Sequence, residues 1–273
     1  MTLPHGLAAI DMDATLLGPD HRIGAANRAA LDRLRAAGVR IVLASGRRHE
    51  NLLRFHAELG IDGPAISGNG ALVRCSRTGE TWHRRLLDPI TTVELLEDGA
   101  ARGITQVVEH DDGGSYVASL TRHSDILAHR TGNPITAVGP LAPRGGESVR
   151  KVIWIADPDV VGDLEQRVAG RWADRLSITV TDPEYLEYMA LGVDKGPALR
   201  TVAERLSVPR EQVLAFGDGA NDAGMLGWAG LGIAMAHGRA EALAAADHVA
   251  PEGDPGEAFA RAVDALFRGV YTV

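Results

Sequence analysis

The stretch from Ala8 to Leu16, AAIDMDATL, decides how the rest of the chain is interpreted. A short apolar run that ends in two carboxylates one residue apart predicts a buried strand with Asp11 and Asp13 at its C-terminal end. Open α/β sheets bind their ligands at that edge. Taken alone, the pattern also fits an exposed turn after a strand, because Asp favours turns. The remaining motifs decide between the two interpretations.

Composition limits the classes of protein that this chain can be. Its 273 residues, 45% of them hydrophobic, predict two globular domains. A formal net charge of -8 argues against broad binding to nucleic acid or anionic lipid, since both need a basic surface. The first residues lack the features of a signal peptide, and no apolar run reaches the ~18 residues that span a membrane. We therefore expect a cytoplasmic protein with no nucleic-acid or membrane partner.

Helices and strands alternate at both ends of the chain. A helix at 25–37, a strand at 39–44, a helix at 48–59 and a strand at 64–67 follow the opening strand. Such alternation predicts a parallel sheet with right-handed crossovers. It resumes later, with helices expected at 196–206, 222–228, 240–246 and 257–267 and strands at 213–216 and 231–235.

The middle of the chain has a different rhythm. After a hairpin at 72–84, the pattern is α+β rather than alternating. The expected elements there are helices at 90–102 and 159–173, strands at 104–109, 115–119, 149–156 and 176–181, and a loose segment at 132–146. The predicted fold class is therefore α/β, a doubly wound parallel sheet formed by 1–85 and 186–273, with an α+β domain inserted at 86–185.

Three expected strands of the parallel sheet end in polar residues. Asp11 and Asp13 follow the first, Ser45 and Gly46 follow the second, and the sequence GDGAND at 217–222 follows a strand near the C-terminus. If these strands are parallel neighbours, their polar ends converge at one edge.

A cation is implied by the carboxylates that would meet there. Two carboxylates ~4 Å apart repel by roughly 4 kcal/mol at an effective dielectric constant of ~20, and Asp11, Asp218 and Asp222 would multiply that repulsion. Because carboxylate and carbonyl oxygens are the available ligands, Mg²⁺ fits better than zinc.

These groups suit attack on phosphorus. A carboxylate nucleophile beside a metal, with hydroxyl, amide and ammonium donors, can neutralise the charge on phosphoryl oxygens. We therefore expect a phosphate ester as substrate. Asp13, one residue from Asp11, is placed to protonate the leaving alcohol and later to activate water.

Four motifs in this order resemble those of the haloacid dehalogenase (HAD) superfamily of phosphohydrolases. The similarity is to the Cof-type group, which has a large cap between its second and third motifs. The motifs are DMDATL at 11–16, LASGR at 43–47, GVDKG at 192–196 and GDGAND at 217–222. The resemblance covers nearly the whole chain and implies a Rossmann-like catalytic core with residues 86–185 as the cap domain.

The resemblance also implies roles for individual residues. Asp11 would be the nucleophile that forms an aspartyl-phosphate, and Asp13 the general acid and base. The phosphoryl group would be held by Lys195 and Ser45, assisted by Thr15, the Gly46 amide and Asn221. Mg²⁺ would be held by Asp11, the backbone carbonyl of Asp13, Asp218 and, directly or through water, Asp222.

Three further residues are candidates with two open interpretations. Asn69 lies in the turn at 67–71, which also matches the Cof-type group, and it either contacts substrate or supports the backbone. Arg47 follows the second motif, and Glu187 lies where the chain returns from the insertion. Each of these two either contacts substrate or forms a salt bridge.

The chain departs from the family pattern at two places. Ala14 stands where glycine is usual, and the methyl group would be costly if the position required a positive φ. Ala236-His237-Gly238 replaces the usual Gly-Asn-Ala, so we expect His237 to be a surface residue.

Lysine is rare in this chain. Of 28 basic residues only Lys151 and Lys195 are lysine. A lysine kept between Asp194 and Gly196 suggests a task that a wide, planar guanidinium cannot perform. Lys151→Arg, by contrast, is expected to leave turnover nearly unchanged.

The leading hypothesis is a Mg²⁺-dependent phosphatase that acts on a small phosphorylated metabolite, such as a sugar phosphate. A phosphomutase would share all four motifs, and a non-catalytic phosphometabolite-binding protein could share the fold. A phosphoaspartate receiver also clusters aspartates, but it has neither the insertion nor a counterpart of Asp13. We expect a monomer or a weak homo-oligomer.

Overall fold

The computed structural model of the protein describes residues 4–271 and divides into two compact units. The core unit comprises Met1–His83 and Asp194–Val273, and the inserted unit comprises Arg84–Val193. Residues 1–3, part of the N-terminal segment considered above, lie outside the described residues.

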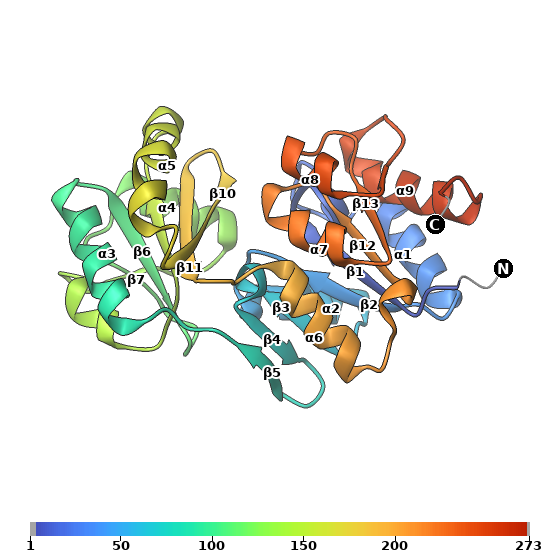
Figure 1. Ribbon diagram of the computed structural model, residues 1–273, viewed down its shortest axis with the longest axis horizontal. Helices are drawn as coiled ribbons and strands as arrows, with labels where there is room; N and C mark the ends of the chain where they lie inside the picture. Colours follow the sequence, from blue (N-terminus) through green and yellow to red (C-terminus); the bar gives the residue numbers. More distant parts are fainter. Residues whose placement is uncertain (1–3, 272–273) are drawn as a thin grey trace. The chain divides into compact units, whose positions relative to one another are not determined.

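An eight-stranded sheet forms the centre of the core unit. Its strands are β1 Leu7–Asp11, β2 Arg40–Ala44, β3 Pro64–Ser67, β4 Leu72–Cys75, β5 Thr81–Arg84, β12 Val213–Gly217, β13 Leu231–Ala234 and β14 His248–Val249. They lie in the order β14-β13-β12-β1-β2-β3-β4-β5 (Figure 1). The strands from β14 to β3 are parallel, and β4 is antiparallel to β3. The predicted parallel sheet is confirmed, and the predicted hairpin forms its antiparallel edge.

Helices cover both faces of this sheet. They are α1 Ala25–Ala36, α2 His49–Leu59, α6 Lys195–Arg205, α7 Ala223–Trp228, α8 Ala240–Ala245 and α9 Ala258–Phe267. Alternate residues of each strand point to opposite faces. Ile10 and Leu43 therefore pack with α1, α2 and α9, whereas Ala9 and Val42 pack with α6, α7 and α8. This is the doubly wound arrangement that the alternating sequence predicted.

The inserted unit is an α+β domain. Its strands are β6 Thr105–His110, β7 Ser115–Val117, β8 Thr136–Ala137, β9 Val149–Ile155, β10 Leu176–Asp182 and β11 Tyr185–Ala190. Its helices are α3 Pro89–Ala101, α4 Arg122–Thr131 and α5 Pro158–Trp172. The strands lie in the order β10-β11-β9-β6-β7-β8. Residues of α3 and α5 pack with Trp154 in one apolar cluster, and Leu127 of α4 packs with Ile153 in another.

The predicted boundary at 186 was wrong. Strand β11 pairs with β9 and β10, so the inserted unit extends to Val193. Helix α4 was also missed, although Thr121 and Ser124 form a reciprocal capping box at its N-terminus and Gly132 ends it with a φ of +67°.

Within residues 4–271, no helix combines the length and the apolar character needed to cross a membrane.

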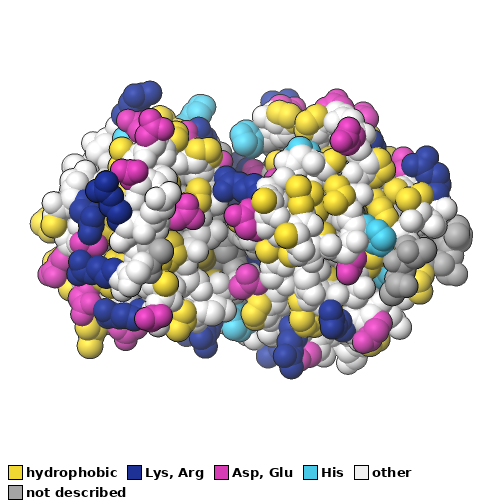
Figure 2. Space-filling view, turned by 45° about the horizontal axis from the view of Figure 1, so that its top comes forward, with side chains coloured by type: hydrophobic (Ala, Val, Ile, Leu, Met, Phe, Trp, Pro, Cys, Tyr) yellow, Lys and Arg dark blue, Asp and Glu magenta, His cyan; other side chains and the backbone are white. Residues whose placement is uncertain are grey.

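Acidic and basic side chains are interspersed over the face shown in Figure 2.

Candidate active site

The candidate site lies at the C-terminal edge of the parallel sheet. Strand β1 pairs in parallel with β2 on one side and with β12 on the other. Asp11 ends β1, Ser45 follows β2, and the segment 218–222 follows β12. The sequence-based expectation that these three strand ends converge is therefore met by the topology.

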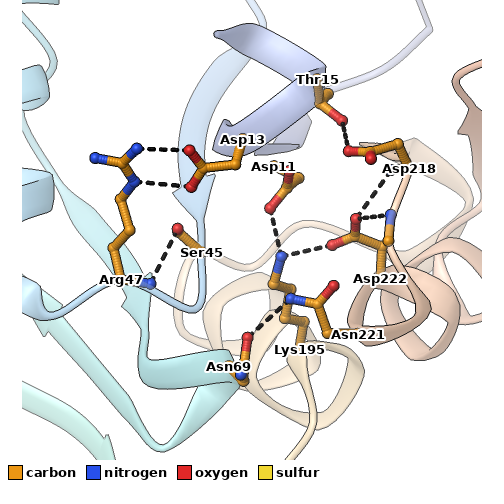
Figure 3. Close-up of polar contacts among 11 residues, drawn as sticks. Asp11, Asp13, Thr15, Ser45, Arg47, Asn69, Lys195, Asp218, Asn221 and Asp222 are labelled. Carbon is orange, nitrogen blue, oxygen red and sulfur yellow. Dashed lines mark hydrogen bonds and ion pairs between the residues drawn. The ribbon is translucent and has the colours of Figure 1, made fainter. Parts of the chain in front are cut away.

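A buried lysine joins two of the carboxylates (Figure 3). The Lys195 Nζ donates to Asp11 Oδ1 and to Asp222 Oδ1, each at 2.5 Å, and the lysine side chain is 0% exposed. Lys195 is the first residue of α6, and the Asp194 carboxylate caps that helix by accepting from the Gly196 amide at 2.6 Å. The start of α6 thus holds the ammonium group between the two acids.

Close packing of helices explains a glycine near this cap. A Cβ on Gly224 of α7 would lie 1.9 Å from Asp194 Oδ1, which is far inside van der Waals contact. Only glycine lets the backbone of α7 approach the cap that places Lys195.

Burial and mutual repulsion dominate the electrostatics. Burial and the neighbouring Asp222 raise the pKa of Asp11 well above its usual range, although Lys195 opposes them. Burial and Asp222 also raise the pKa of Asp218 to about 6. Burial alone would lower the pKa of Lys195, but the facing carboxylates of Asp11 and Asp222 raise it. The cluster therefore favours a cation among its acids.

These acids could hold a metal ion. Carboxylate oxygens of Asp11, Asp218 and Asp222 all lie within 4.8 Å of one another. An all-oxygen donor set fits a hard ion such as Mg²⁺. The two Asp222 oxygens are already engaged, since Oδ1 accepts from Lys195 and Oδ2 accepts from the Asp218 and Gly219 amides at 2.9 and 2.8 Å. Asp11 and Asp218 each have one oxygen without a protein donor among residues 4–271, so they fit direct ligation better than Asp222 does.

Asp13 is held by an arginine fork. Arg47 Nε donates to Asp13 Oδ2 at 2.7 Å, and Arg47 Nη2 donates to Oδ1 at 2.5 Å. Burial alone would raise the pKa of Asp13, but the hydrogen bonds and charge of Arg47 hold it below its usual value. The structure thus shows a salt bridge for Arg47, and a contact of Arg47 with substrate stays a prediction.

The turn that follows Asp11 contains a strained residue. Ala14 has a φ of +60°, in the left-handed region that costs an L-residue about 1–2 kcal/mol. The next residue, Thr15, donates its hydroxyl to Asp218 Oδ1 at 2.8 Å. The hydroxyl of Thr15 thus orients an acid, and its expected contact with a phosphoryl group stays a prediction.

Asn69 lies beside the second motif. It is buried with a φ of +55°, and its Oδ1 accepts from Asn221 Nδ2 at 2.9 Å. A Cβ on Gly46 would lie 2.7 Å from the same Oδ1, which explains the glycine after Ser45. Ser45 is itself buried, and its Oγ accepts from the Arg47 amide at 3.1 Å. Asn69 therefore links the second and fourth motifs.

The sequence-family model of the haloacid dehalogenase-like hydrolases matches residues 8–263 of this chain. The chain belongs to that family. Its four motifs and their order thus identified the family correctly, and the α/β fold is the one expected for it.

Solved structures with the same fold cover almost the whole hydrolase. A haloacid dehalogenase-like hydrolase from Bacteroides thetaiotaomicron is 25% identical, with a TM-score of 0.83 over 96% of this chain and 100% of its own. One from B. subtilis is 22% identical, with a TM-score of 0.82 over 95% and 99%. A sugar phosphatase of HAD subclass IIB is 20% identical, with a TM-score of 0.81 over 97% and 100%.

Glu187 of this hydrolase lies in the inserted unit rather than in the core unit. Its Oε1 accepts from Lys151 Nζ at 2.9 Å, and Glu109 Oε2 lies 3.7 Å from the same ammonium group. All three side chains are buried. The structure thus shows a salt bridge for Glu187, and a contact of Glu187 with substrate stays a prediction.

Sequence reasoning missed one contact of the hydrolase site. His237 is exposed, as expected for a surface residue, but its Nε2 lies 2.8 Å from the Ala14 backbone oxygen. The departure of 236–238 from the family pattern was the signal that could have drawn attention to it.

Proposed function

We propose that this hydrolase is a Mg²⁺-dependent phosphatase of small phosphorylated metabolites, acting through an aspartyl-phosphate on Asp11. The observation that carries the proposal is the Asp11 carboxylate at the end of β1, ion-paired with buried Lys195 and adjacent to Asp218 and Asp222. Such a carboxylate has an ammonium group beside it to attract and orient a phosphoryl group.

In the first half-reaction, an Asp11 oxygen attacks phosphorus and the bond from phosphorus to the alcohol oxygen breaks. The leaving oxygen takes a proton from Asp13. Lys195, with the Ser45 hydroxyl, offsets the charge on the phosphoryl oxygens.

In the second half-reaction, Asp13 takes a proton from water, and the water oxygen attacks phosphorus. The bond from phosphorus to Asp11 then breaks, which releases inorganic phosphate and restores the carboxylate. Arg47 favours the ionised form of Asp13, and this is the form that the second step needs. Donation of a proton in the first step requires the Arg47 fork to loosen when substrate binds.

Mg²⁺ would be held by Asp11, Asp218 and the backbone carbonyl of Asp13, with Asp222 acting through water. When bound, it would neutralise negative charge on the transferring phosphoryl group. Asp222 would keep its observed tasks, which are to hold Lys195 and to receive the two backbone amides of the loop.

A sugar phosphate is the substrate that we favour. Support comes from the likeness in fold to the sugar phosphatase of subclass IIB, at 20% identity. The inserted unit, an α+β domain of its own, would act as a cap that distinguishes among leaving groups.

The proposal is tested by measuring phosphate release from a panel of sugar phosphates and other phosphorylated metabolites. We expect turnover that a chelator stops and Mg²⁺ restores. Restoration by zinc but not by Mg²⁺ would contradict the all-oxygen site. Release of an isomeric phosphate ester in place of inorganic phosphate would instead identify a phosphomutase.

Asp11→Asn should abolish turnover while the fold is retained, because an amide does not attack phosphorus. Asp174→Asn, at an exposed position of the inserted unit, is the matched control and should leave turnover unchanged. Asp13→Asn should lose far more activity on alkyl than on aryl phosphates, because an aryl leaving group needs less help from an acid. Substantial turnover by Asp11→Asn would contradict the nucleophile assignment.

A further inference from the structure

His237 reaches the strained turn of the active site from another segment of the core unit. It follows β13, whereas Ala14 follows β1. The His237 Nε2 lies 2.8 Å from the Ala14 backbone oxygen. Because a carbonyl oxygen only accepts, the ring must carry a proton on Nε2 and donate it.

The conformation of Ala14 controls two neighbouring side chains. Asp13 precedes it and lies in the Arg47 fork, and Thr15 follows it and donates to Asp218. The turn is closed by the Leu17 amide, which donates to the Met12 oxygen at 2.8 Å.

The left-handed φ of Ala14 is not one that alanine favours. A rotation of this residue toward a right-handed or extended conformation would redirect the chain on both sides of it. The hydrogen bond between Leu17 and Met12 opposes that rotation from within the turn, and the hydrogen bond from His237 opposes it from outside, at the Ala14 carbonyl.

We propose that His237 is a positioning residue that holds the left-handed turn at Ala14, and through it Asp13 and Thr15, in the arrangement needed for catalysis. The proposal rests on the proposed phosphatase function. His237 acts through the Ala14 peptide and not on the reacting atoms. Its side chain is exposed, so its replacement leaves the apolar core intact.

The first test compares His237→Ala with His237→Gln. The Gln side chain can place an N–H donor near the position of Nε2 without carrying an imidazolium charge. We expect His237→Ala to lower kcat on an aryl phosphate by about three- to tenfold, the size of one neutral hydrogen bond, with KM unchanged. His237→Gln should recover most of that loss. His129→Ala, which replaces an exposed histidine of α4, is the matched control and should leave kcat unchanged.

The second test repeats His237→Ala in an Ala14→Gly background. Glycine adopts the left-handed conformation without strain, so the turn should persist without the hydrogen bond. The loss in kcat should therefore shrink toward none. Equal losses in both backgrounds, or a Gln variant no better than the Ala variant, would overturn the proposal.

Hydrogen exchange of the Leu17 amide provides a readout that needs no substrate. His237→Ala should accelerate this exchange by about the same three- to tenfold factor with Ala14, and by much less with Gly at position 14. Unchanged exchange in the Ala14 background would overturn the proposal. If the wild-type protein releases no phosphate from any ester, the proposed function fails, yet the exchange cycle still tests the positioning role.

Discussion

Lys195→Met removes the ammonium group that the site is built around and keeps a side chain of similar length. The group is fully buried, with two carboxylate oxygens 2.5 Å from its nitrogen. Removing one partner of a buried ion pair costs about 3–5 kcal/mol, because the remaining charge is left unpaired. Here two carboxylates remain. Since the pKa of Asp11 is already raised, its protonation limits the loss, and we expect about 3 kcal/mol of unfolding free energy.

Lys195→Arg separates charge from shape. It keeps the positive charge, but a planar guanidinium cannot place one nitrogen 2.5 Å from both Asp11 and Asp222 in the space of an ammonium group. A displacement of ~1 Å in an active site can cost on the order of a hundredfold in rate. We expect kcat to fall by at least about tenfold, which is ~1.4 kcal/mol of transition-state stabilisation.

Urea denaturation in a chelator would measure the unfolding free energy of both variants, and an aryl phosphate with Mg²⁺ would measure turnover. The reasoning fails if Lys195→Met unfolds at the wild-type urea concentration. It fails separately if Lys195→Arg, with its fold confirmed, turns over at the wild-type rate. Lys195 would then be a generic positive charge.

Two predictions concern groups outside the active site. Burial lowers the pKa of His56 to about 4, so between pH 6.5 and 4 the unfolded chain binds more protons than the folded protein does. The free energy of unfolding should therefore decrease by about 3 kcal/mol as the pH is lowered from 6.5 to 4. His56→Asn, whose amide can replace the ring nitrogen that contacts Ser76, should flatten that dependence in urea titrations, and an unchanged slope would refute it. Lys151→Met should destabilise the inserted unit by about 3–5 kcal/mol, and adding Glu187→Leu should recover part of that loss, because Glu109 stays buried beside the missing ammonium group; equal urea midpoints for wild type and the single variant would refute the argument.

The sequence was most informative where one physical pattern dominates. Apolar strands that end in polar residues predicted that Asp11, Ser45 and the 218–222 segment share one edge, and β1 indeed lies between β2 and β12. Glycine after a helical pattern predicted the end of α2, where Gly60 has a φ of +60°. Such signals are local, and each can be read within a few residues.

The sequence did not predict which side chains contact each other. Nothing near Arg47 in the chain distinguishes a fork on Asp13 from a contact with substrate, because the choice depends on how two loops approach each other. Strand β11 was missed for a related reason. Its identity comes from pairing with β9 and β10, and its sequence, YLEYMA, carries no turn signal that would separate it from the returning chain.

Both lysines of the chain occupy the same kind of buried position. Both lysines of this arginine-rich chain are buried between two carboxylates, Lys195 between Asp11 and Asp222 and Lys151 between Glu109 and Glu187. A compact ammonium group can face two separate acids from one point, whereas guanidinium is shaped for a planar fork on one. The expectation that Lys151→Arg leaves turnover nearly unchanged stays a prediction, but Lys151 is 3% exposed and occupies the same kind of position as Lys195, so we expect the substitution to lower stability. The same substitution should destabilise both sites, but only at Lys195 should it also slow turnover.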